Sequence, residues 1–246
     1  MIRIFPFLVL IFFISCEAKK KNTKSKKKTD TTDGFKKYYY SDGKLKTELI
    51  ILNGKRNGNA RIYYKNGKVS LEMNYKNGLR DGVSKRYYED GTIYQETNYK
   101  DDKINGERKK YRENGKILSI AKYEKDLPCL NLKEVLQNGE IKNNYPQLII
   151  TPEDKLKREG VYIINLSLSD RVRKVNYYIG KLSSTGCLND RVMMLHTDTK
   201  KDIGFVKYNL PPGGFMMEEL NFIAEIETVM GNSYLTQKKF FVSIEN

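Results

Sequence analysis

Glycine recurs along the middle of this chain at a fixed interval of 24 residues. Other positions keep the same step, among them an aliphatic column, a glutamate column and pairs of adjacent tyrosines. So many positions in register indicate a tandem repeat, in which each unit is one supersecondary element that packs against its neighbours. The glycines form two sets, and we expect both to close turns: Gly43, Gly67, Gly91 and Gly115, and Gly58, Gly82 and Gly106.

Each repeat unit is predicted to be a β-hairpin. Apolar and polar residues alternate between the glycines, so that Ala60 and Ile62 share one face while Arg61 lies on the other. The Asn-Gly and Asp-Gly dipeptides at the glycines favour tight hairpin turns. Because a lone hairpin is marginal in water, we expect the hairpins to stack in one sheet with a continuous apolar row.

Three motifs resemble the bacterial variant of the MORN repeat: Y-Y-K-N-G-K at 63–68, Y-Y-E-D-G-T at 87–92 and Y-K-N-G-L-R-D-G at 75–82. The resemblance covers residues 38–125. It departs from the pattern in the end units, for example where Arg112 replaces the second tyrosine of a pair. The variant is similar to the YwqK-type antitoxin family, named for partners of secreted toxins, while eukaryotic relatives suggest scaffolding or contact with membrane lipids. The resemblance therefore implies a binding role.

One face of the predicted sheet carries a strip of aromatic and charged side chains. The strip consists of Tyr39, Tyr63, Tyr87, Arg61, Lys85, Glu48, Glu72 and Glu96. These residues either pair with one another across the strands, or bind an extended ligand such as a glycan, a peptide or a lipid headgroup. Nucleic acid would also suit basic and aromatic groups, but export of the protein argues against that partner.

The N-terminus is typical of a secretory signal. Residues 4–14 are apolar and follow Arg3. This run is shorter than the roughly 20 residues that a membrane span needs, and fits a signal-peptide core. The following F-I-S-C resembles a bacterial lipobox and predicts a signal peptide over 1–16 with lipidation of Cys16; cleavage after Ala18 is the alternative.

A Lys-rich stretch follows, and we expect 17–35 to be a disordered linker. With Cys16 lipidated, the protein would be exported by the general secretory route. It would then be anchored at the bacterial cell envelope, on the outer membrane or the periplasmic side.

Charge changes along the chain. The net charge is +15, from 45 Lys and Arg against 30 Asp and Glu. Residues 38–125 hold 20 basic and 12 acidic residues, whereas 126–246 hold 15 of each. This break predicts a repeat domain over 36–125 and a second domain over 126–246.

The second domain is predicted to be a β-sandwich of immunoglobulin-like architecture, which makes the whole fold all-β. Short segments alternate between apolar and polar residues over 161–169, 175–179, 220–226 and 234–244. Gly231-Asn232 lies between the last two, as a two-residue hairpin turn would. Cys129 and Cys187 either form a disulfide in an oxidising compartment or remain free buried thiols.

Catalytic signatures are scarce in this sequence. It has one histidine, His196, and neither a zinc-protease nor a nucleotide-binding motif. The adjacent Glu218 and Glu219 would face opposite sides of a strand, which argues against shared acid and base roles. We therefore predict no enzyme, no metal and no cofactor.

The sequence as a whole favours a non-enzymatic envelope lipoprotein. In this interpretation the repeat sheet binds or scaffolds a protein, glycan or lipid partner. The alternatives are an antitoxin or immunity protein that neutralises a toxin by direct binding, and an envelope glycan hydrolase. Exposed hairpin edges offer a route to homo-oligomers.

Overall fold

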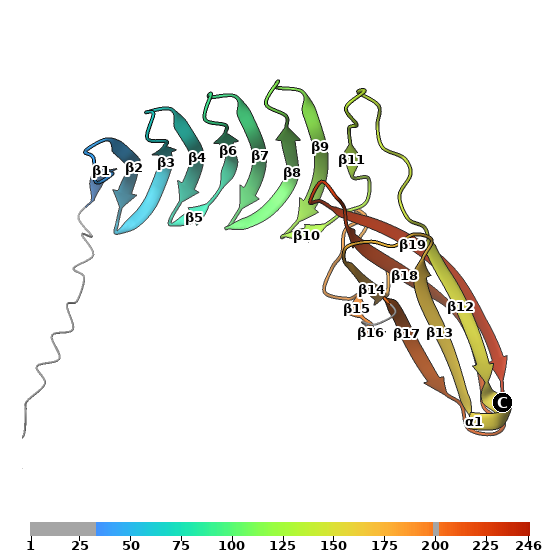
Figure 1. Cartoon of the computed structure of the whole chain (residues 1–246). Helices are drawn as coiled ribbons and strands as arrows, with labels where there is room; N and C mark the ends of the chain where they lie inside the picture. Colours follow the sequence, from blue (N-terminus) through green and yellow to red (C-terminus); the bar gives the residue numbers. More distant parts are fainter. Residues whose placement is uncertain (1–32, 199–201) are drawn as a thin grey trace, which may run out of the picture. The chain divides into compact units, whose positions relative to one another are not determined.

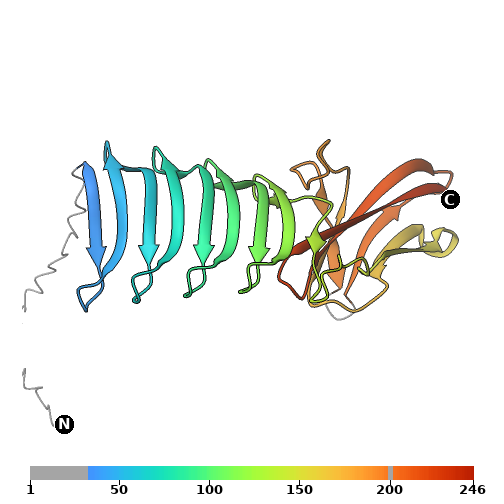
Figure 2. The same ribbon diagram turned by 90° about the horizontal axis from the view of Figure 1, so that it is seen from above.

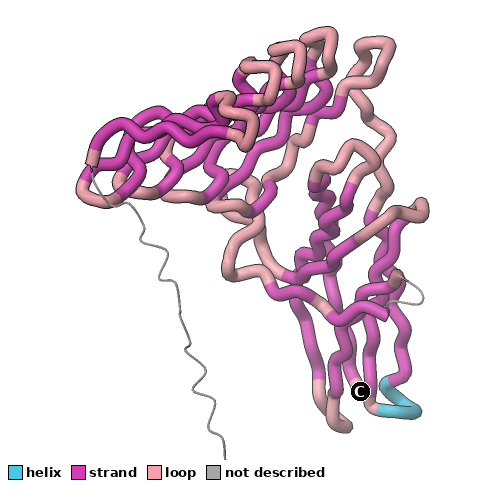
Figure 3. The backbone as a smooth tube through the Cα atoms, turned by 60° about the vertical axis from the view of Figure 1, so that its left-hand side comes forward, coloured by secondary structure: helices cyan, strands magenta, loops and turns pink. Residues whose placement is uncertain are grey.

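The computed structural model describes residues 33–198 and 202–246, which belong to one compact unit. The predicted signal peptide, Cys16 and most of the Lys-rich linker lie outside the described residues. Strands dominate the described part, and its one helix is α1 (Leu156–Glu159), so the predicted all-β class is confirmed (Figure 3). Within 33–198 and 202–246, no helix has the length and hydropathy that crossing a membrane requires.

The repeats form one antiparallel sheet of eleven strands, as the hairpin pattern predicts (Figures 1 and 2). Its main path runs β1-β2-β3-β4-β6-β7-β8-β9-β10, while β5 pairs with β4 and β11 pairs with β9. The strands are β1 (Gly34–Tyr39), β2 (Leu45–Leu52), β3 (Lys55–Tyr63), β4 (Val69–Lys76), β5 (Leu79–Arg80), β6 (Gly82–Tyr87), β7 (Ile93–Lys100), β8 (Lys103–Tyr111), β9 (Ile117–Glu124), β10 (Leu127–Pro128) and β11 (Lys133–Glu134).

One set of glycines closes turns as expected. Gly67 has a φ of 85° and donates its N–H to the carbonyl of Tyr64 at 3.0 Å. The side chain of Asn66 accepts from the N–H of Lys68 at 2.9 Å, which fixes the turn. The same backbone bond recurs at Gly43, Gly91 and Gly115.

The other set does not close turns, which corrects the prediction for Gly58, Gly82 and Gly106. Gly58 and Gly106 lie inside β3 and β8, where the pairing with the preceding strand shifts register, and Gly82 begins β6 after the break from β5. Their φ values of 73°, 110° and 102° suit glycine. The interrupted hydrogen-bond ladder requires a positive φ, which residues with a Cβ atom rarely adopt. The turns at this end of the hairpins are Asn53-Gly54, Asn77-Gly78, Asp101-Asp102 and Lys125-Asp126.

Two four-stranded antiparallel sheets form the predicted sandwich, in the orders β12-β13-β17-β16 and β15-β14-β18-β19. Its core contains Ile164, Leu166, Tyr177 and Phe222, all fully buried. The strands are β12 (Leu148–Lys155), β13 (Val161–Leu168), β14 (Val175–Ile179), β15 (Met193–Met194), β16 (His196–Asp198), β17 (Ile203–Asn209), β18 (Phe215–Glu227) and β19 (Ser233–Glu245).

The connection between β18 and β19 differs from the predicted two-residue turn. It spans 228–232, because Thr228 and Asn232 close the loop instead of Gly231 and Asn232. The N–H of Thr228 donates to the carbonyl of Asn232 at 2.9 Å. The N–H of Asn232 donates back to the hydroxyl of Thr228 at 3.2 Å.

A contact of this loop, a ring stack and a disulfide join the sandwich to the end of the repeat sheet. Glu134 on β11 is fully buried and accepts a hydrogen bond from the Asn232 amide at 2.7 Å. The rings of Tyr145 and Tyr234 stack with their centroids 3.9 Å apart. A disulfide links Cys129, next to β10, to Cys187 in the sandwich. The last repeat is therefore anchored covalently and by a buried polar network.

Candidate functional site

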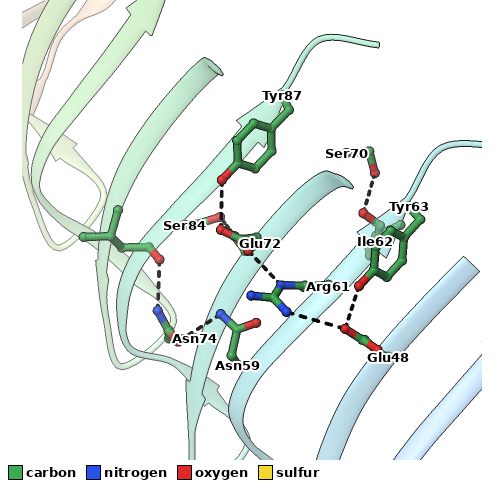
Figure 4. A network of polar contacts seen from close by, with 11 residues as sticks. Glu48, Asn59, Arg61, Ile62, Tyr63, Ser70, Glu72, Asn74, Ser84 and Tyr87 are labelled. Atoms are coloured by element: carbon green, nitrogen blue, oxygen red, sulfur yellow. Dashed lines mark hydrogen bonds and ion pairs between the residues drawn. The ribbon is translucent and has the colours of Figure 1, made fainter. Parts of the chain in front are cut away.

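The predicted strip lies on one face of the repeat sheet, which we call the ladder face, and its groups bind one another (Figure 4). The hydroxyl of Tyr63 donates to Glu48 at 2.6 Å, and that of Tyr87 donates to Glu72 at 2.8 Å. Arg61 lies between the two carboxylates, 2.8 Å from Glu72 and 3.7 Å from Glu48. These contacts form a continuous polar ladder across neighbouring hairpins.

The ladder continues into the next repeat with a residue that the sequence analysis missed. Tyr111 donates to Glu96 at 2.8 Å, and Lys85 pairs with the same carboxylate at 3.3 Å. Each of these ladder tyrosines bonds to the glutamate 15 residues before it. Tyr39 differs, because the residue 15 positions before it in the sequence is Lys24. Its side chain is 57% exposed. Tyr39 is thus the one strip tyrosine outside this pairing among the described residues.

The electrostatics of the ladder stabilise a single protonation state. The hydrogen bond from Arg61 is the main cause that lowers the pKa of Glu72, and the hydrogen bond from Tyr111 lowers the pKa of Glu96. Burial, together with the bond to Glu72, raises the pKa of Tyr87 to about 12. Near neutral pH the carboxylates are therefore ionised and Tyr87 keeps its proton.

The opposite face, which we call the junction face, changes character along the repeats. In the first complete hairpin it carries Ala60, Ile62, Leu71 and Met73. The following strands place polar residues in the same columns, so the predicted apolar row is interrupted. The replacements are Ser84 and Arg86 on β6, Gln95 and Thr97 on β7, and Arg108 and Lys110 on β8.

The six replacements form two adjacent rows across the sheet. One row is Ser84, Thr97 and Arg108, which lie directly opposite one another on successive strands. The other row has the same register and consists of Arg86, Gln95 and Lys110. Side chains opposite each other on antiparallel strands are about 5 Å apart and diagonal neighbours about 7–8 Å, so the two rows form one cluster.

This cluster lines a cavity of about 330 Å³, which we call the basic hollow. Its lining includes a fourth cation, Arg80, but no aspartate or glutamate. Arg80 is neutralised from outside the hollow by Asp102, at 2.9 Å. The Arg86 side chain is exposed and makes no hydrogen bond or ion pair with another described residue, so its charge is available to a ligand.

The other two cations of the hollow are held by neighbouring groups. Arg108 stacks on Tyr123, with its guanidinium carbon 4.6 Å from the ring centroid, and donates to the Tyr123 hydroxyl at 3.2 Å. Its Nε atom is buried without a hydrogen-bond partner. Lys110 donates to the carbonyls of Met230 and Gly231 at 3.1 and 2.9 Å, and burial beside Arg108 lowers its pKa.

Comparison with known proteins supports the repeat assignment. Three consecutive segments, residues 56–77, 80–101 and 104–125, match the family model described as the MORN repeat variant. No curated protein matches the chain. MORN repeats point to a binding or scaffolding role.

The MORN-type columns also explain why sequence reasoning missed the basic hollow. The columns that stay constant make the turns and the ladder. The signal lies instead in columns that change from apolar to basic, such as Ile62, Arg86 and Lys110.

In the described residues, no group of three or more His, Cys, Asp or Glu side chains could hold a metal ion.

Proposed function

We propose that this protein is a non-enzymatic binding or scaffolding protein that engages its partner through the junction face of its MORN-type repeats. The basic hollow carries this proposal, because it presents cations that no lining carboxylate neutralises. The charges of Glu48, Arg61 and Glu72 on the ladder face are instead satisfied by one another.

Site-specific photo-crosslinking in cells tests which face binds. A photo-reactive amino acid at Met73 reports on the basic hollow, which this side chain lines. The matched control is Val83, an uncharged residue 40% exposed on the ladder face of the next strand. We expect partner adducts from position 73 and none from position 83. Adducts from position 83 alone, or from neither position, would contradict the proposal.

We also propose that the protein acts at the bacterial cell envelope, anchored by a lipid on Cys16. The support is the N-terminal sequence, in which a short apolar run ends next to this cysteine. Cell fractionation of the wild type and Cys16→Ala tests the anchor. We expect the wild type in the membrane fraction and the variant released from it; a wild-type protein in the cytosol would refute the proposal.

A further inference from the structure

The basic hollow has the chemistry of an oxyanion site. We infer that it binds a phosphate group carried by a small hydroxylated molecule. This inference rests on the proposed function and specifies the ligand class for the junction face.

Charge balance favours phosphate over a single carboxylate. Arg86 on β6 and Arg108 and Lys110 on β8 lie on either side of β7, and the lining of the hollow contains no carboxylate to offset them. Like charges that line one hollow repel one another, and the repulsion falls when a multiply charged anion binds between them. A phosphate monoester carries about −1.5 to −2 charges near neutral pH, whereas a carboxylate carries one.

Arg108 supplies an ordered cation for such a ligand. Tyr123 holds the guanidinium by stacking and by a hydrogen bond to Nη1, so the side chain is ordered before any ligand arrives. The Nε donor is buried without a partner, and a buried unsatisfied donor is costly unless an acceptor reaches it. The planar guanidinium is well suited to phosphate oxygens.

The remaining lining groups suit a hydroxylated body. Ser84 and Thr97 are buried hydroxyl residues, and the amide of Gln95 donates to the Thr97 hydroxyl at 2.9 Å. That bond leaves the Gln95 carbonyl and the Thr97 proton free for the hydroxyl groups of a ligand. A cavity of about 330 Å³ also has the size of a small-molecule site.

Calorimetric titration of the full-length protein tests the ligand class. We expect glycerol phosphate to bind, inorganic phosphate to bind more weakly, and glycerol to give no signal. Added salt should weaken glycerol phosphate binding, because the attraction is electrostatic. Vesicles of phosphatidylglycerol test the lipid source of the same chemistry. Binding to vesicles without binding to glycerol phosphate would overturn the inference.

Two variants tie the binding to the hollow. We expect Arg86→Gln and Arg108→Gln each to weaken glycerol phosphate binding about tenfold or more, because each removes a charge-assisted hydrogen bond. Arg56→Gln is the matched control, since Arg56 also stacks on a tyrosine and donates to its hydroxyl, at 3.1 Å, but does not line the hollow. Unchanged affinity in Arg86→Gln would refute the site.

The two proposals fail in different ways. If no phosphate ligand binds but position 73 still crosslinks to a partner, the junction face remains the binding surface and the ligand class is wrong. If neither phosphate binding nor crosslinking is observed, both proposals are wrong.

Discussion

At the scale of single residues, the repeated glutamates serve to couple hairpins. Glu72 accepts from Arg61 on β3 and from Tyr87 at the end of β6, so one carboxylate connects both neighbouring strands. The same geometry recurs at Glu96 with Tyr111. The recurrence of these residue types every 24 positions is therefore explained by packing between units.

The ladder predicts a pH-dependent stability. The pKa of Glu72 is lowered from 4.5 in the folded protein, so its ionised form stabilises the fold above the ordinary pKa, and this contribution is lost as the pH falls through the lowered value. We expect Glu72→Gln to lower the free energy of unfolding by about 0.2–1 kcal/mol at neutral pH. The loss of stability below pH 4.5 should also be shallower in the variant.

Urea denaturation across this pH range measures both effects. Glu89→Gln is the control, because the Glu89 side chain is exposed and takes no part in the ladder. Equal stability of Glu72→Gln and Glu89→Gln at every pH would show that the ladder contributes nothing.

At the scale of elements, the sequence predicts strands better than turns. Alternation identified the hairpin strands and four of the eight sandwich strands, because burial of one face imposes a period of two. The four are β13, β14, β18 and β19. The turn at the other end of each hairpin was not predicted, because positions with a left-handed backbone accept Asn, Asp and Gly alike. Those turns read Asn77-Gly78 in one unit and Asp101-Asp102 in the next, so no column stays constant. The constant glycines nearest these turns, such as Gly106, mark interruptions of the strand pairing instead.

The basic hollow could not be predicted from the sequence, for a related reason. The ladder could be predicted as pairing within the strip, since its members fall in constant columns. The basic hollow depends on the register of three strands and on columns that change residue type, as in Ala60, Ser84 and Arg108. The unpartnered donor of Arg108 depends on burial, which the sequence does not show. The loop that holds Lys110 depends on a contact between residues more than a hundred positions apart.

At the scale of the whole described unit, the loop 228–232 of the sandwich contacts both the last strand of the repeat sheet and the basic hollow. Its Thr228 and Asn232 side chains bind the buried Glu134, and its Met230 carbonyl accepts from Lys110. The position of a cation in the hollow therefore depends on how the sandwich docks against the last repeat.

This coupling predicts the effect of Glu134→Ala. The substitution leaves the buried Thr228 and Asn232 without their acceptor, which costs about 1–3 kcal/mol of unfolding free energy. We expect calorimetry to show the single unfolding transition at a lower temperature or divided in two. Glycerol phosphate binding should weaken as well, since Lys110 loses the ordered carbonyls that position it. Glu140→Ala, at an exposed site on the same segment, should change neither. Unaltered unfolding and binding in Glu134→Ala would mean that the hollow is formed by the repeats alone.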